Sequence, residues 1–271
     1  MRLSLLVLAF LAACSSKTTA PVVSRPSSTG PLTEEQFKAL HALPTPGPKG
    51  LAGQTIDLEG TKAYLSLPPG RGPLPAIVVI HEWWGLNGNI EHWADRLASA
   101  GWAALAIDLY SGTVATTREE AMAAMKTVYD AKAAAVIRAG LDFIAADPRI
   151  HATKKAVIGW CFGGGWSLQA ALSNPDLDGA IIYYGQLETD PTKLTSIKAK
   201  VLGVFGRKDK GIPPEKVAEF EAALKQAGVP AEIHEYDAEH AFANPSNPVY
   251  DETSAADAWR HVLAFLDKLR A

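Results

Sequence analysis

Apolar and polar positions repeat in two ways along the chain, and together they predict an α/β fold. Segments 54–60 and 62–68 show the every-second-residue pattern of a hairpin and are bordered by Gly and Pro. Later segments are either apolar runs, typical of strands covered on both faces, or amphipathic stretches with helical spacing. Further strands are expected at 74–81, 102–110, 154–160, 179–185, 199–206 and 231–237, and helices at 89–101, 117–146, 163–173, 214–228 and 251–269.

Because strands and helices take turns, we expect a mostly parallel central sheet with helices on both faces. In such a sheet, functional side chains lie at the carboxyl ends of the strands. The length of 271 residues and the hydrophobic content of 48% are enough for a full core. No further boundary is visible after Gly50, so residues 51–271 are expected to form one domain.

The first residues have the pattern of an export signal. One Arg is followed by an apolar stretch that is short for a membrane span, and then by small residues that end at Cys14. The sequence LAAC at 11–14 resembles the bacterial lipoprotein box, which implies a signal over 1–14 and a lipid anchor on Cys14. Ser15 resembles a sorting signal for the outer membrane, facing the periplasm. An ordinary cleaved signal and a buried N-terminal helix are the alternatives.

Composition narrows the possible partners. Residues 15–50 are rich in Ser, Thr, Pro and Gly, which is typical of a tether. The net charge of −3 and the lack of a basic run argue against a nucleic-acid partner. The chain has two cysteines, so lipidation of Cys14 would leave Cys161 without a disulfide partner.

No zinc spacing such as H-E-x-x-H occurs, and neither a metal nor another cofactor is expected. The sequence does not indicate an oligomeric state.

Residues with catalytic chemistry stand just after predicted strands. The order nucleophile, acid, histidine is that of α/β-hydrolases, and the segment GWCFG at 159–163 matches their strand–turn–helix elbow with cysteine in place of serine. A helix that begins at this turn favours the thiolate. The residues are Glu82, Cys161, Asp209 and His240.

These motifs resemble those of the dienelactone hydrolases, which are cysteine members of the α/β-hydrolase superfamily, and especially of exported relatives that carry HEWWGLN. The motifs HEWWG, DLY, GWCFGG, GRKDKGIP and EHAFAN match in type and order, from about Gln54 to the C-terminus. The resemblance implies an α/β-hydrolase fold. It also implies hydrolysis of carboxylic esters or lactones by a Cys-His-Asp triad through a thioester acyl-enzyme.

The resemblance also implies a role for each catalytic position. Cys161 would be the nucleophile, His240 the general base and then the acid, and Asp209 the carboxylate that orients His240. Glu82 matches the glutamate that holds the resting thiol and is displaced when substrate binds.

The surrounding residues would bind the substrate. The backbone N–H groups of Trp83 and Phe162 would form the oxyanion hole, and Trp84 is expected to line the pocket. Dienelactone hydrolases that act on chloroaromatic breakdown products carry an arginine four residues after the catalytic histidine, and this chain has Asn244 there. An amide does not replace the bidentate cation, although Arg118 would be a possible source of charge. A broader ester or lactone preference is therefore as consistent with the sequence as true dienelactone.

Other interpretations stay open on the sequence alone. A non-catalytic envelope protein that retains the scaffold is one, and a thiol-based redox protein is another, although no resolving cysteine is present. Each residue also has a structural alternative: a buried small residue for Cys161, a turn for Asp209, packing for His240 and an ion pair with an arginine for Glu82.

Overall fold

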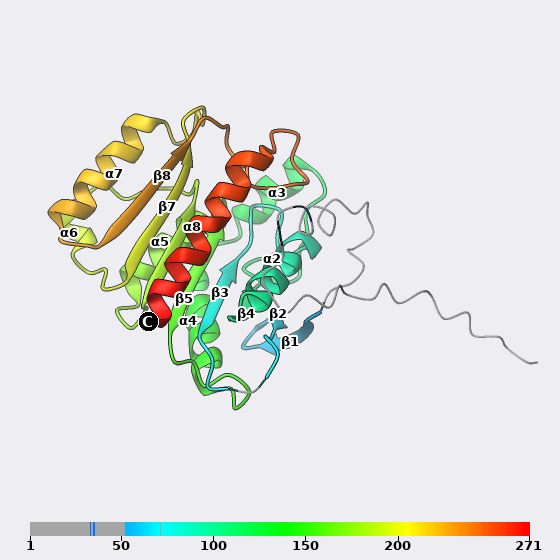
Figure 1. The fold of residues 1–271 in the computed structure, drawn as a ribbon. Helices are drawn as coiled ribbons and strands as arrows, with labels where there is room; N and C mark the ends of the chain where they lie inside the picture. Colours follow the sequence, from blue (N-terminus) through cyan, green and yellow to red (C-terminus); the bar gives the residue numbers. More distant parts are fainter. Residues whose placement is uncertain (1–32, 34, 36–51, 71) are drawn as a thin grey trace, which may run out of the picture.

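The computed structural model describes residues 33, 35, 52–70 and 72–271. The predicted signal, Cys14 and nearly all of the predicted tether at 15–50 lie outside the described residues. The centre of the fold is an eight-stranded sheet covered by helices on both faces (Figure 1). None of the described helices combines the length and the apolar character needed to cross a membrane.

The sheet is mostly parallel, as predicted. Its strand order is β1-β2-β4-β3-β5-β6-β7-β8; β2 is antiparallel to both β1 and β4, and all other neighbours are parallel. The carboxyl ends of the parallel strands therefore meet at one edge. The strands are β1 Gln54–Leu58, β2 Thr61–Ser66, β3 Ala76–Ile80, β4 Ala103–Ile107, β5 Lys155–Trp160, β6 Gly179–Tyr183, β7 Lys200–Gly206 and β8 Ala231–Tyr236.

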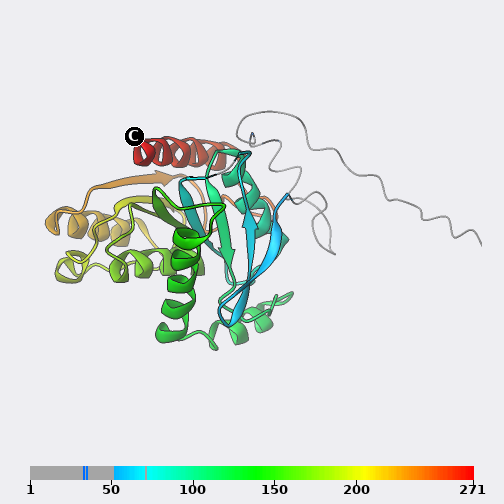
Figure 2. The same ribbon diagram turned by 90° about the horizontal axis from the view of Figure 1, so that it is seen from below.

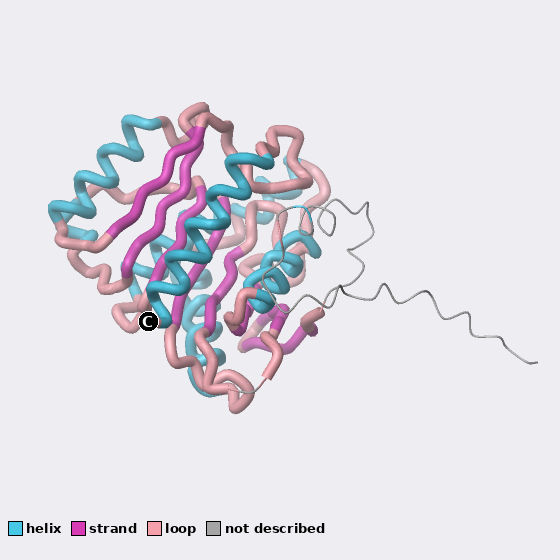
Figure 3. The backbone as a smooth tube through the Cα atoms, viewed as in Figure 1, coloured by secondary structure: helices cyan, strands magenta, loops and turns pink. Residues whose placement is uncertain are grey.

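Two helical layers enclose the sheet. Helices α2 and α8 pack on one face, and α4, α5 and α7 pack on the other. Figure 2 shows α8 and α4 on opposite sides of the sheet, and Figure 3 shows the strands between the helices. The helices are α2 Gly88–Ser99, α3 Arg118–Met125, α4 Asp130–Ala146, α5 Phe162–Ser173, α6 Pro191–Leu194, α7 Pro214–Gln226 and α8 Glu252–Arg270.

The central strands are apolar because both of their faces are covered. Every residue of β3 and of β4 is buried, with successive side chains entering the two opposite cores. Each fully buried Val, Leu or Ile side chain contributes about 1.5–3 kcal/mol. Aromatic rings continue one core toward α2, where Trp93 stacks on Trp160 with a centroid distance of 4.5 Å. Burial on both faces explains why these runs lack alternation.

The helical region predicted over 117–146 consists of two helices, α3 and α4. Thr117 caps α3 in a capping box with Glu120, and the helix ends at Met125. The Thr127 hydroxyl donates to the Ala124 carbonyl at 2.7 Å, and Tyr129 is extended before α4 begins. A β-branched residue whose hydroxyl bonds the preceding turn competes with helix continuation, which accounts for the break.

Candidate active site

Cys161 occupies a strained turn between β5 and α5. Its backbone has φ 55° and ψ −114°, which is unfavourable for a residue with a Cβ. Its N–H donates to the Tyr183 carbonyl at 3.0 Å, and its carbonyl accepts from the Gly165 N–H at 3.2 Å. The thiol is free and half-buried. The turn therefore raises the sulfur at the carboxyl edge of the sheet, as the elbow motif predicts.

Glycines around the turn allow the backbone segments to approach closely. A Cβ at Gly159 would lie 2.1 Å from the Gly163 carbonyl oxygen, and one at Gly163 would lie 2.3 Å from that of Ile80. A Cβ at Gly164 would lie 2.4 Å from the Tyr183 carbonyl oxygen. No real Cβ atom is accommodated at such distances, so α5 is seated directly against the ends of β3, β5 and β6.

His240 joins Cys161 to Asp209. The Nδ1 of His240 lies 2.6 Å from Asp209 Oδ2, and Cys161 is close enough to the ring to raise the pKa of His240. The other oxygen of Asp209 accepts the backbone N–H groups of Gly211 at 2.8 Å and Ile212 at 3.2 Å. An ionised carboxylate has only acceptors, so Nδ1 carries the proton of this bond. The structure thus brings together the three residues predicted as a triad.

Electrostatics favour the charged form of the imidazole. Burial lowers the pKa of His240, but hydrogen bonds to Asp209 and Cys161, and the charges of both, outweigh burial and raise it to about 10. Burial raises the pKa of Asp209, yet the hydrogen bond and charge of His240, with the two backbone donors, bring it below its ordinary value. The imidazole thus lies between two acidic partners that favour its positive form.

Glu82 lies close to the triad and binds Asn244. The Asn244 amide donates to Glu82 Oε2 at 2.6 Å, and both side chains are buried. Burial raises the pKa of Glu82 to about 7, against the lowering effects of the His240 charge and the Asn244 hydrogen bond. Sequence analysis expected Glu82 to hold the resting thiol. In the structure the hydrogen bond to the Glu82 side chain comes from Asn244, and none joins Glu82 to Cys161 among the described residues.

Two backbone N–H groups next to the sulfur are available to a ligand. Those of Trp83 and Phe162 donate to no other group within the part of the chain that the structure describes. The Trp83 segment is held by His81, a residue to which sequence analysis gave no role. Buried His81 donates from Nδ1 to the Glu82 carbonyl at 2.6 Å and accepts the Leu109 N–H at Nε2, 3.1 Å away. Burial also lowers the pKa of His81, consistent with this neutral form. Its place at the end of a buried strand was the available signal.

A cavity of about 470 Å³ opens over the sulfur. Arg118, Trp84 and Asn244, which were expected at the pocket, are not among its lining residues. The Arg118 guanidinium lies 5.5 Å from the centroid of the Trp83 ring, and the Trp84 ring lies 4.8 Å from it. Sequence analysis did not single out Tyr184, although it directly follows β6. The lining residues are Trp83, Met125, Asp130, Cys161, Phe162, Gly165, Trp166, Gln169, Tyr184, Gln186, Gly211, Ile212 and His240.

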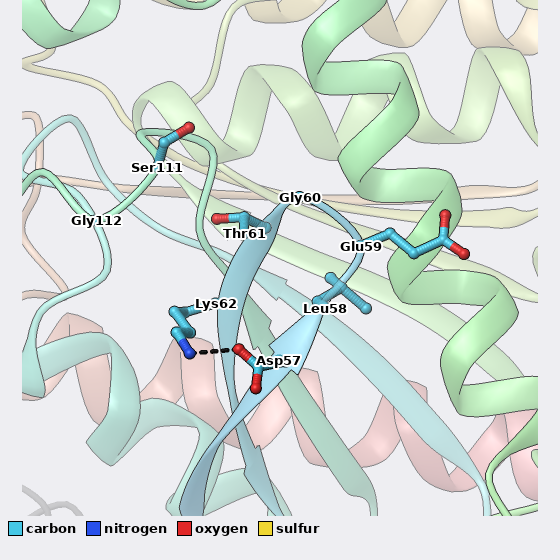
Figure 4. Close-up of a pocket in the computed structure, with 8 residues that line it drawn as sticks. All are labelled: Asp57, Leu58, Glu59, Gly60, Thr61, Lys62, Ser111 and Gly112. Carbon is cyan, nitrogen blue, oxygen red and sulfur yellow. Dashed lines mark hydrogen bonds and ion pairs between the residues drawn. The ribbon is translucent and has the colours of Figure 1, made fainter.

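A second cavity, of about 580 Å³, lies at the turn between β1 and β2. Figure 4 shows Lys62 directed toward Asp57, with which it forms an ion pair, and Glu59 directed away from both. The residues that line this cavity include neither a cysteine nor a histidine. The cavity over Cys161 contains both a cysteine and a histidine, Cys161 and His240. Across the described residues, no three His, Cys, Asp or Glu side chains are grouped to hold a metal ion.

The chain is similar in sequence and in structure to known proteins of one family. The sequence pattern of the dienelactone hydrolase family matches residues 61–269. A protein of Yersinia pestis named "Putative carboxymethylenebutenolidase" is 32% identical over 252 residues, covering 85% of this chain and 92% of that protein. "Protein usf" of Aquifex pyrophilus is 31% identical over 226 residues, covering 79% and 97%. A dienelactone hydrolase-like promiscuous phosphotriesterase from metagenomic libraries has a crystal structure with a TM-score of 0.73 and 26% identity, covering 80% of this chain and 98% of that one.

Proposed function

Because this chain belongs to the dienelactone hydrolase family, we propose that it cleaves carboxylic esters or lactones with Cys161 as nucleophile, His240 as base and acid, and Asp209 as the orienting carboxylate. The observation that carries the proposal is that His240 bonds Asp209 at 2.6 Å and lines the same cavity as Cys161, which raises the pKa of His240. The α/β-hydrolase fold is the scaffold on which such a chain of contacts performs acyl transfer.

The first half of the reaction forms an acyl-enzyme. His240 accepts the thiol proton, and the Cys161 sulfur forms a bond to the substrate carbonyl carbon while the carbonyl π pair moves to oxygen. The resulting oxyanion accepts hydrogen bonds from the N–H groups of Trp83 and Phe162, each worth ~3 kcal/mol. The tetrahedral intermediate then expels the alcohol, which takes the proton from His240. The product of this half is a thioester.

The second half returns the enzyme to its starting state. His240 removes a proton from water, and the hydroxyl oxygen attacks the thioester carbonyl. The same two N–H groups stabilise the second oxyanion. Collapse expels the Cys161 sulfur, which regains the proton from His240, and the carboxylic acid leaves. Every bond change is covered by the three side chains and water, so no step requires a cofactor.

The cavity favours a substrate with an apolar body. Aromatic and apolar side chains surround the sulfur, including Phe162, Trp166 and Ile212, while Gln169 and Gln186 offer neutral hydrogen bonds. No Lys or Arg is among the residues that line it. These features support a general ester or lactone substrate, and they offer the carboxylate of dienelactone no bidentate arginine in the lining.

The proposed setting is the cell envelope. We infer from the residue pattern at 11–14 that Cys14 is lipidated and anchors an exported protein of the HEWWG type to the outer membrane, with 15–50 as the tether. Mass spectrometry of the natively expressed protein should find a diacylglyceryl group on an N-terminal Cys14. A mature chain that begins elsewhere, or an unmodified Cys14, contradicts this part of the proposal independently of the hydrolase activity.

Activity is tested with 4-nitrophenyl acetate and with a dienelactone on the purified protein. Cys161→Ala should abolish hydrolysis, and a trapped thioester on Cys161 should be visible by mass spectrometry of the quenched enzyme. Ser167→Ala is the matched control, because Ser167 lies on the same helix and its hydroxyl donates to the Ile181 carbonyl, at 2.9 Å, away from the sulfur. Hydrolysis that survives in Cys161→Ala refutes the mechanism. A folded wild-type protein with no turnover of any ester favours the non-catalytic scaffold.

A further inference from the structure

A chain of amide and hydroxyl groups leads from α2 to Glu82. The Nδ2 of Asn89 donates to Ser246 Oγ at 2.9 Å. Ser246 in turn donates to Asn244 Oδ1 twice, from Oγ at 2.6 Å and from its backbone N–H at 2.9 Å. Because two donors occupy the oxygen of Asn244, its NH₂ group must face Glu82, where the 2.6 Å bond is found. The orientation of this buried amide is therefore determined by its neighbours.

The groups around Glu82 decide where its carboxyl group turns. Asn244 donates a hydrogen bond to Glu82, and His240 is positive when protonated. The buried Tyr184 is also close: burial raises the pKa of its hydroxyl most, and the charge of Glu82 raises it further. The Asn244 amide lowers the pKa of Glu82, but the larger effect of burial leaves that pKa raised to about 7. An ionised Glu82 also repels a thiolate. Bound to Asn244, Glu82 therefore leaves the Cys161 sulfur to His240.

We propose that Asn244 is a positioning residue that keeps Glu82 away from Cys161, so that the thiol and imidazole pair forms before any substrate binds. This inference rests on the proposed function and extends it. An enzyme in which the glutamate held the thiol would require substrate to activate the nucleophile. Here the resting protein already contains the reactive pair, because the Ser246 and Asn244 side chains hold the competing group.

Reactivity of the resting thiol tests the proposal without any turnover. Iodoacetamide is added to the substrate-free protein between about pH 5 and 9, and alkylation of the Cys161 peptide is followed by mass spectrometry, which separates it from Cys14. The wild type should react rapidly near neutral pH, because the His240 imidazole is available to take the thiol proton. Asn244→Leu removes the donor, so a protonated Glu82 is free to approach the sulfur. The reaction rate near neutral pH should then fall severalfold, because Glu82 competes with His240 for the thiol.

A double variant separates positioning from general damage. In a Glu82→Gln background no carboxyl group competes for the thiol, so adding Asn244→Leu should change the alkylation rate less than about twofold. Asn174→Leu is the matched control: Asn174 is also 6% exposed and its amide donates to the Ala170 carbonyl at 2.9 Å, away from the thiol. This control should leave the alkylation profile unchanged even if stability falls.

Several outcomes would overturn the inference. An unchanged alkylation profile in folded Asn244→Leu does so, and so does an equal loss of rate in the Glu82→Gln background. If Asn244→Leu does not fold, the smaller Asn244→Ala supplies the same measurement, since it also removes the donor and adds no charge. Failure of the proposed function looks different: Cys161-independent or absent ester hydrolysis, whatever the alkylation rates. Normal hydrolysis with an unaffected thiol profile contradicts the role of Asn244 alone.

Discussion

Replacement of Asp209 by Asn should prevent His240 from acting as a base, because the imidazole proton moves from Nδ1 to Nε2. One oxygen of Asp209 is held by the backbone N–H groups of Gly211 and Ile212, and the other faces Nδ1 of His240. In the Asn variant, the single oxygen stays with the two backbone donors, so the NH₂ group faces Nδ1. Nδ1 must then accept, Nε2 carries the proton, and the ring can no longer take a proton from Cys161.

The size of the effect follows from the alternative geometry. To keep a proton on Nδ1, the Asn side chain would have to turn its NH₂ group toward two N–H donors and leave both without an acceptor. Each unsatisfied donor costs about 1–3 kcal/mol, so the inactive arrangement is favoured by about 4 kcal/mol in the middle of the range. At 1.36 kcal/mol per factor of ten, kcat should fall about 10³-fold.

The assay is steady-state hydrolysis of 4-nitrophenyl acetate, with nitrogen NMR of the imidazole to identify the protonated atom. Asp251→Asn is the control, because Asp251 also accepts a backbone N–H, that of Ser254 at 2.7 Å, but caps α8. It should retain wild-type kcat. A loss smaller than tenfold in Asp209→Asn, or NMR evidence that Nδ1 stays protonated in that variant, would refute the reasoning.

Three further substitutions test the structure. The pKa of Glu82 is raised from 4.5 to about 7 by burial, so the folded state holds this proton more tightly than the unfolded chain and loses stability as pH rises from about 4.5 to 7. Urea unfolding of Glu82→Gln relative to wild type should therefore show a gain of up to about 3 kcal/mol between pH 4 and 8, and an equal difference at both pH values would contradict the burial argument. Gly163→Ala places a Cβ 2.3 Å from a backbone oxygen and should lower the free energy of unfolding by more than about 3 kcal/mol. In the control Gly165→Ala, the nearest atoms lie 3.3 Å from the new Cβ, and the loss should be under about 1 kcal/mol. Similar losses in both variants would exclude the close approach at Gly163. Thr117→Ala removes half of the capping box with Glu120 and should raise amide exchange in α3 by the equivalent of about 1 kcal/mol, so unaltered exchange would show that the cap is unimportant.

The fold was predictable where burial dictates composition. The strand at 76–80 is covered on both faces, which requires an unbroken apolar run, and a short run of this kind between turn residues is typical of a central parallel strand. The break between α3 and α4 was missed because the composition stays rich in Ala across it, and only one hydroxyl bond at Thr127 marks the boundary. Helix α6, over 191–194, was missed because four residues are too few to show a period.

The site was predictable only in its residue types. A cysteine between glycines after a strand carries a local signal, since the backbone there must bend and pack closely. No local sequence signal identifies the hydrogen-bond partner of Glu82. Asn244 lies 162 positions away, and nothing in the pattern around it indicates that its amide faces inward. Arg118 was expected to supply charge to the pocket, yet its guanidinium lies over the Trp83 ring, because a flexible cation is placed by the aromatic faces around it.

The contacts of α5 divide the reaction centre into a stiff half and an adjustable half. Cys161 and the start of α5 are fixed against the strand ends by the close glycine contacts, while Asp209 and His240 lie in the loops after β7 and β8. Insertions or substitutions in those loops would change the orientation of His240 without moving Cys161. New substrate preferences in this protein should therefore arise from its C-terminal loops, with the glycine-lined corner unchanged.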